Sequence, residues 1–171
     1  NLLNVAALTS RRLAIRPEPV GLHELVHSAL QQITWLVRRK GAKVENRIPP
    51  DTANIEGDHE LLVRVFVNLL DNALQHSKAG DSIEISAQTE SGGVQVDVKD
   101  RGPGVPESYR TRIFDEFFRL STGGPRSTGL GLAYCKLVAE AHGGRIWASP
   151  RKGGGSCFSL FLPFQVLEGG R

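Results

Sequence analysis

Long apolar runs, disulfide patterns and metal-binding motifs are all missing from this sequence. No apolar stretch approaches the roughly 18 residues that a membrane-spanning helix needs, so we expect this chain to make no membrane contact. The two cysteines, Cys135 and Cys157, are far apart and fall in different predicted elements. They predict neither a disulfide framework nor a metal site, and a reducing cytoplasm is the simplest compartment.

A strong charge of one sign is also missing. The 21 basic and 18 acidic residues are interspersed, and the net charge is only +3. No basic run with interleaved aromatic residues is present, which argues against a nucleic-acid partner. With 40% hydrophobic residues, the 171 residues suit one domain around a single core.

Glycine, in contrast, is abundant, and the 19 glycines occur in clusters. Clustered glycines between apolar segments are typical of tight turns, or of loops that approach a ligand closely. The clusters are Gly102 and Gly104, Gly123 and Gly124, Gly129 and Gly131, Gly143 and Gly144, and Gly153 to Gly155.

Apolar periodicity predicts three helices. Residues 22–40 follow the 3.6-residue period and end at Gly41, and residues 59–76 do so after Asp58, a good N-cap. Residues 130–142 form the third, and residues 106–119 predict one or two short helical turns.

Alternating apolar and polar residues predict strands between these helices. Residues 82–87 and 94–98 alternate and are joined as a hairpin, and residues 145–149 and 156–162 form a second hairpin. Residues 43–48 and 54–57 predict a further pair of short strands. The order predicts an α+β fold, a two-layer sandwich whose mixed, mostly antiparallel sheet has about three helices on one face.

Three groups of polar residues and glycines in the predicted helices and loops are candidates for a binding site. Asn68 and Asn72 are four residues apart and share a helix face, where their amide oxygens suit a hard cation such as Mg²⁺. Taken alone, such a pair is more often two surface or capping asparagines. The second feature is Asp100 with Gly102 and Gly104, directly after a strand. A carboxylate there can accept a hydrogen bond from an exocyclic amine, although Asp and Gly are also common in plain turns.

The third feature is the run Gly129-Leu130-Gly131-Leu132, which opens a helix. Free backbone amides at a helix N-terminus bind phosphate, and glycine permits close approach. The spacing fits neither a Walker loop nor a dinucleotide fingerprint, so this signal is weak on its own.

Together, the order and spacing of these motifs resemble the catalytic domain of sensor histidine kinases. This family belongs to a superfamily that includes gyrase-type, heat-shock chaperone and mismatch-repair ATPases. The matching motifs are the asparagine box Asn68-Leu69-Leu70-Asp71-Asn72, the first glycine box at Asp100, Gly102 and Gly104, the phenylalanine box 113–119, the second glycine box 129–132, and the closing strand from Gly154 to Pro163.

The resemblance implies a Bergerat-type fold that binds ATP and Mg²⁺. It implies that Asn72, with Asn68 beside it, holds Mg²⁺ through the phosphates, and that Asp100 holds the adenine amine. Arg119 would touch the phosphates, and residues 120–128 would form a lid. The full set of implied nucleotide-binding residues is Asn68, Asn72, Gln75, His76, Asp100, Gly102, Gly104, Val105, Ile113, Phe117, Arg119, Thr128, Gly129, Leu130, Gly131, Leu132 and Ser156.

Two positions depart from the family pattern. Gln75 stands where many members have a lysine or arginine aimed at phosphate, so one charge contact is lost. His76 stands where an aromatic residue often stacks near the base, and histidine can still stack. Neither departure breaks the resemblance.

The phosphoacceptor histidine of the family is not recognisable in this sequence. His23 and His59 each begin such a motif, but no basic residue and no proline follow at the required positions, and the other three histidines lack the context. We expect residues 1–16 to be the tail of the dimerisation helix hairpin and a linker, with a break at residues 16–19. Residues 17–165 would form the catalytic domain, and 166–171 a C-terminal tail.

The implied partners are the chain's own dimerisation and phosphoacceptor domain, as a homodimer, and a response-regulator receiver domain. The implied location is cytoplasmic, although full-length sensors of this type are often membrane-anchored. Three alternatives stay open: an ATP-gated ATPase of the same superfamily, a non-catalytic module with a degenerate pocket, and a serine kinase of the anti-sigma type. Against the first, hydrolysing relatives carry a glutamate as general base where Asn68 stands, and asparagine cannot take a proton.

Overall fold

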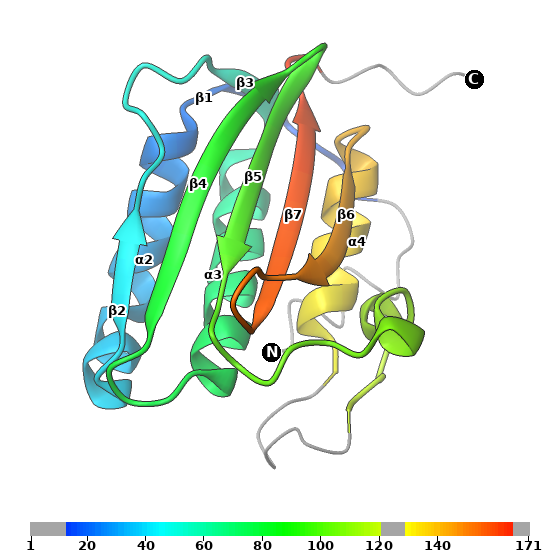
Figure 1. Cartoon of the computed structure of the whole chain (residues 1–171). Helices are drawn as coiled ribbons and strands as arrows, with labels where there is room; N and C mark the ends of the chain where they lie inside the picture. The colour runs from blue at the N-terminus through cyan, green and yellow to red at the C-terminus, as the bar shows by residue number, and fades with distance from the viewer. Residues whose placement is uncertain (1–12, 121–128, 166–171) are drawn as a thin grey trace.

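The fold consists of one five-stranded sheet with three α-helices packed on one of its faces (Figure 1). The computed structural model describes residues 13–120 and 129–165. The strand order is β2-β4-β5-β7-β6, and the other face of the sheet carries no helix in the described ranges. This confirms the predicted two-layer α+β sandwich. The elements are β1 Glu18–Val20, α2 Leu22–Lys40, β2 Lys43–Asn46, β3 Ile55–Gly57, α3 His59–His76, β4 Ser82–Glu90, β5 Gly93–Lys99, η1 Glu107–Tyr109, η2 Arg112–Phe114, α4 Gly131–Ala141, β6 Arg145–Pro150 and β7 Ser156–Pro163.

Helix α3 lies at the centre of the helical layer and contacts both α2 and α4. It spans the predicted residues, and Asp58 caps its start by accepting a hydrogen bond from the backbone N–H of Leu61 at 3.1 Å. Its apolar stripe is fully buried, while Asn68 and Asn72 are only half-buried at the border of the stripe. The helix therefore packs into the core and keeps one polar edge for other partners.

Helices α2 and α4 pack on either side of α3. Helix α2 ends at Gly41, whose φ of 62° is the left-handed cap that glycine adopts without strain. Helix α4 ends before His142, and this histidine is buried where α4 meets the start of α3. Its Nε2 accepts a hydrogen bond from the Asp58 backbone N–H at 2.9 Å, and its Nδ1 donates to the Val138 carbonyl. Burial lowers the pKa of His142, which favours the neutral ring that this pair of bonds requires.

The sheet is mostly antiparallel, as predicted, and both predicted hairpins are present. The predicted pairing of the two short strands is wrong. Strand β2 instead pairs in parallel with β4, and β3 pairs with β1. The connection from β2 to β4 contains β3 and helix α3, and such a long crossover is what a parallel pair needs.

Strand β1 lies within the segment that the sequence indicated as a break. Pro19 is opposite Glu56 in this two-stranded pair. Proline lacks a backbone N–H and is therefore tolerated at a sheet edge, where one donor can be spared. Residues 1–12 of the predicted tail and linker 1–16, and the predicted tail 166–171, lie outside the described residues. The predicted domain limits stay predictions.

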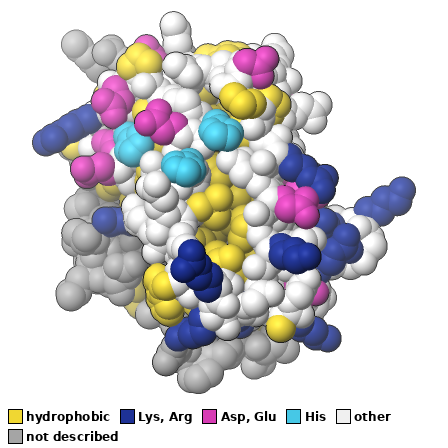
Figure 2. All heavy atoms as spheres, turned by 90° about the vertical axis from the view of Figure 1, so that its left-hand side faces the viewer, with side chains coloured by type: hydrophobic (Ala, Val, Ile, Leu, Met, Phe, Trp, Pro, Cys, Tyr) yellow, Lys and Arg dark blue, Asp and Glu magenta, His cyan; other side chains and the backbone are white. Residues whose placement is uncertain are grey.

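The long edge of the molecule formed by α2 and β2 carries charges of both signs. Figure 2 shows acidic and histidine side chains toward the top of this face, lysines and arginines around its lower part, and apolar side chains in a hollow between them. None of the helices in the described ranges is long and apolar enough to cross a membrane.

Candidate functional site

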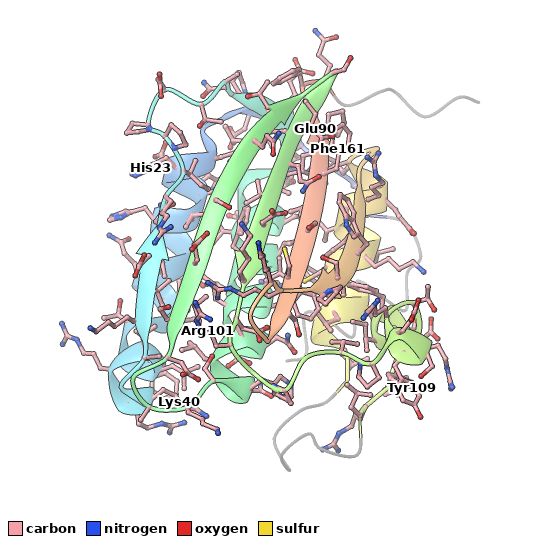
Figure 3. The ribbon with its side chains drawn as sticks, in the orientation of Figure 1. His23, Lys40, Glu90, Arg101, Tyr109 and Phe161 are labelled. Atoms are coloured by element: carbon pink, nitrogen blue, oxygen red, sulfur yellow. The ribbon has the colours of Figure 1, made fainter. Side chains whose placement is uncertain are left out.

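Four segments that are distant in sequence meet at one end of the sheet. They are the second half of α3, the loop after β5, the start of α4 and the start of β7. Arg101, which follows β5, and Tyr109 in η1 both lie at this end in Figure 3. The polar residues predicted from the sequence are on these segments, and they can be followed from α3 outward.

Asn68 on α3 faces the first turn of α4. A Cβ atom added to Gly131 would lie 3.3 Å from Asn68 Oδ1, so the amide and the helix start are in direct contact. The Asn68 side-chain nitrogen is buried and has no hydrogen-bond partner among the described residues. A buried donor without an acceptor is costly unless a ligand or water provides one. Asn72 is half-buried one turn further along the same helix face.

Asp100 follows β5 and is only 2% exposed. Its Oδ1 accepts hydrogen bonds from the backbone N–H groups of Gly102 at 2.8 Å and Ser156 at 3.2 Å. Burial raises the pKa of Asp100, while these two bonds and the nearby His76 and Arg151 act in the opposite direction. The result is a carboxyl group that is fixed in orientation and shielded from water, with neighbours that oppose the rise in its pKa.

Gly102 brings this carboxylate against the end of α3. A Cβ atom at Gly102 would lie 2.9 Å from the Cβ of His76 and 3.0 Å from its carbonyl oxygen, so no side chain fits there. His76, Asn72 and Asn68 recur every four residues on α3. This face of α3 therefore contacts the loop that begins at Asp100, called the Asp100 loop below, through His76. It contacts the start of α4 through Asn68, and Asn72 lies between these two residues.

The phenylalanine segment is tied to the same helix start. The backbone N–H of Phe117 donates to the Gly129 carbonyl at 3.1 Å, and a Cβ atom at Gly129 would lie 2.8 Å from the Phe117 carbonyl carbon. Phe117 has a φ of 61°, which is uncommon for a residue with a bulky side chain, and the ring is 68% exposed. Ile113, in contrast, is buried in the core beside α4. The sequence predicted that both residues contact the nucleotide, and these roles stay predictions.

A cavity of about 470 Å³ opens beside these segments, within the usual range for small-molecule sites. The aromatic rings of Tyr109 and Phe118 form part of its wall. Their centroids are 5.8 Å apart, so the two rings contact each other. The sequence indicated Gly104 and Arg119 as nucleotide-binding residues and Leu120 as the start of the lid. It gave no role to Pro103, Pro106, Tyr109 and Phe118, although the aromatic residues of 106–119 were a usable signal. The lining residues are Pro103, Gly104, Pro106, Tyr109, Phe118, Arg119 and Leu120.

The remaining described residues of the predicted site make contacts elsewhere in the structure. Gln75 is exposed, and its amide donates to Asp71 one turn earlier at 2.8 Å. The Val105 carbonyl accepts from Arg110, and Leu130 is buried directly before α4. Leu132 is packed against the core. Thr128 and the predicted lid 120–128, except Leu120, lie outside the described residues. The roles of all these residues stay predictions.

Oxygen donors at this site are side-chain amides and one carboxylate. In the described part of the chain, no group of three or more His, Cys, Asp or Glu residues could hold a metal ion. Any cation bound near Asn68 and Asn72 would therefore share its coordination with a ligand and with water, as Mg²⁺ does in nucleotide sites.

Comparisons with known proteins identify the family of this chain. Residues 57–166 match the family described as histidine kinase-, DNA gyrase B-, and HSP90-like ATPase. The chain is 35% identical over 165 residues to the adaptive-response sensory kinase SasA of Crocosphaera subtropica, covering 95% of this chain and 43% of SasA. It is 38% identical over 167 residues to the sensor protein KdpD of Escherichia coli, covering 97% of this chain and 18% of KdpD.

Among solved structures, the mycobacterial sensor histidine kinase MprB superposes with a TM-score of 0.76 at 30% identity, covering 89% of this chain and all of that one. The chain spans less than half the length of the curated relatives it matches. The match over residues 57–166 includes the asparagine pair, Asp100 and both glycine clusters. The chain therefore belongs to the histidine kinase-, gyrase B- and HSP90-like ATPase family, as the ATPase domain of a sensor histidine kinase.

Proposed function

We propose that this domain binds ATP with Mg²⁺ between α3, the Asp100 loop and the start of α4. The observation that carries the proposal is the convergence of three complementary groups. A half-buried amide pair, a buried carboxylate and a glycine-opened helix start lie along the second half of α3. Each group suits a different part of one nucleotide.

In this proposal, Asp100 accepts a hydrogen bond from the exocyclic amine of adenine, and Gly102 keeps the loop flat against the base. The amides at the start of α4 and the charge of Arg119 bind the phosphates. Asn72 and Asn68 hold the cation, which neutralises phosphate charge during transfer. The orphaned Asn68 nitrogen supports this assignment, because it is a donor that a phosphate oxygen or a cation-bound water would satisfy.

We further propose that the γ-phosphate passes to a histidine on another domain of the full-length protein, and then to an aspartate of a response regulator. Phosphoryl transfer of this kind depends on positioning and charge neutralisation. The kinase ThkA, which shares this fold with a TM-score of 0.78 at 23% identity, was solved in complex with the response regulator TrrA. Membership of the sensor kinase family supports the same partner here.

The competing function is steady ATP hydrolysis. Hydrolysis needs a general base for water, and the resemblance puts a glutamate at position 68 in hydrolysing relatives. Asn68 contacts Gly131 through its amide and has no acid–base chemistry near neutral pH. Asn68 therefore favours transfer to an acceptor over hydrolysis.

The test compares this chain with the full-length protein. We expect the chain alone to bind ATP with Mg²⁺ in a calorimetric titration and to release little phosphate. The full-length protein should acquire an acid-labile phosphate on histidine. Failure of the chain to bind ATP, or steady phosphate release by the chain alone, would count against the proposal, and the second result would favour the hydrolase.

A further inference from the structure

Arg151 is a nearly buried guanidinium group directly behind the Asp100 loop. It is the residue after β6, and its side chain is only 11% exposed. Its Nη1 donates to two backbone carbonyls at the end of β5, those of Lys99 at 3.3 Å and Asp100 at 3.2 Å. The guanidinium group thus binds the main-chain carbonyl of Asp100, whereas the backbone N–H groups of Gly102 and Ser156 bind its carboxylate.

A carboxylate on the open face of the sheet holds Arg151 in place. Glu84 lies between the buried residues Ile83 and Ile85 on β4, so its side chain points away from the helices. Glu84 Oε2 is 3.7 Å from Arg151 Nη2, and the same carboxylate also contacts Lys99 and Arg47. Arg151 therefore links the charged outer face of the sheet to the backbone of Asp100.

The loop that Arg151 begins also fixes Asp100 directly. The Arg151 N–H donates to the Gly155 carbonyl at 3.1 Å, and the Asp100 N–H donates to the Ser156 carbonyl at 2.9 Å. The Ser156 N–H returns a bond to the Asp100 carboxylate. The backbone and the side chain of Asp100 are both held by this turn, and Arg151 closes it.

We propose that Arg151 is a positioning residue that orients Asp100 and so determines the preference for adenine. The inference rests on the nucleotide site proposed above. The planar guanidinium can reach two carbonyls and a carboxylate at once, whereas a lysine ammonium is a point charge with a different geometry. A carboxylate that is displaced even slightly loses a directional bond to the base amine.

The test measures affinities for ATP and for inosine triphosphate, which has a carbonyl oxygen in place of the amine. The wild type should bind ATP more tightly, and Asp100→Asn should remove this preference. We expect Arg151→Ala to weaken ATP binding about tenfold, the loss of one charge-assisted bond, with little change for inosine triphosphate. Arg151→Lys should lose part of the preference. It keeps the positive charge, so it should fold even if the alanine variant does not. Arg47→Ala is the control, because Arg47 is exposed and shares Glu84 without reaching Asp100.

The pH dependence of ATP affinity separates positioning from a general structural role. Adenine binding needs the ionised carboxylate, so affinity should fall as the pH drops through the pKa of Asp100. The positive charge of Arg151 lowers that pKa, and its removal should move the fall to higher pH. Arg151→Lys keeps the charge and should leave the midpoint near that of the wild type.

Two outcomes overturn the proposal while the nucleotide site itself stands. One is an unchanged ratio of ATP to inosine triphosphate affinity in both Arg151 variants. The other is an equal loss for both nucleotides with no shift in the pH profile. If the wild type shows no preference, or Asp100→Asn has no effect, the assignment of the adenine site fails together with this inference.

Discussion

Asn72→Ala is expected to abolish Mg²⁺-dependent nucleotide binding. Asn72 is half-buried between His76, which borders the Asp100 loop, and Asn68, which contacts the start of α4. Loss of an oxygen donor to a bound cation removes about 1.5–3 kcal/mol, or about ten- to hundredfold in affinity. Alanine is the best helix former, so α3 should keep its structure and the loss cannot be assigned to unfolding.

The measurement is a calorimetric titration with ATP in Mg²⁺ and again in excess chelator. The wild type should bind far more tightly with Mg²⁺, and the variant should bind equally weakly in both. Gln32→Ala is the matched control, since Gln32 is an exposed amide on α2, away from the site. A variant that keeps the wild-type response to Mg²⁺ would remove Asn72 from the cation site.

Gly155→Ala should cause the largest loss of stability of any conservative change in the site. Gly155 has a φ of 103°, and its Cβ atom would lie 2.1 Å from the Asp100 carbonyl oxygen. This neighbour is a backbone atom at the end of the central strand β5 and cannot rotate away. We expect a loss of about 4 kcal/mol or more in the free energy of unfolding, together with the loss of ATP binding, because the Asp100 loop must move.

Gly154→Ala separates backbone strain from this contact. Gly154 has a similar φ of 100°, but a Cβ atom there would meet nothing within 4 Å. Its substitution should cost only about 1–2 kcal/mol, the strain of the left-handed conformation. Thermal unfolding of the two variants checks this, with about 2–4 °C expected per kcal/mol. Equal melting temperatures would show that the approach of Gly155 to Asp100 is not tight.

The helices were predictable because their signals are local. Helix α3 has a continuous apolar stripe, and Asp58 caps its start through its own side chain, so periodicity and capping agree on its bounds. Strands β1, β2 and β3 have only three or four residues each and no resolvable period. Their pairing depends on contacts between distant segments. For this reason β1 was not predicted as a strand, and β2 and β3 were wrongly predicted to pair with each other.

The parts of the site that depend on particular side chains were predictable from the sequence. The asparagine pair, Asp100 and the glycines had a recognisable spacing. The structure brings Asn68 into contact with Gly131, and it brings Gly102 into contact with His76 and Asp100 two turns further along α3. Arg151 was not predictable in this way. Its partners are backbone carbonyls some fifty residues earlier in the chain, and a carbonyl has no sequence signature.

The central claim is that α3, the Asp100 loop and the start of α4 form one nucleotide site. Nuclear magnetic resonance of the isotopically labelled chain, titrated with Mg²⁺ and a non-hydrolysable ATP analogue, tests it most directly. We predict that the side-chain amide of Asn72 and the backbone amides of Gly102 and Gly131 shift together, with a single dissociation constant. Shifts confined to one of these segments, or shifts that follow different affinities, would contradict the claim.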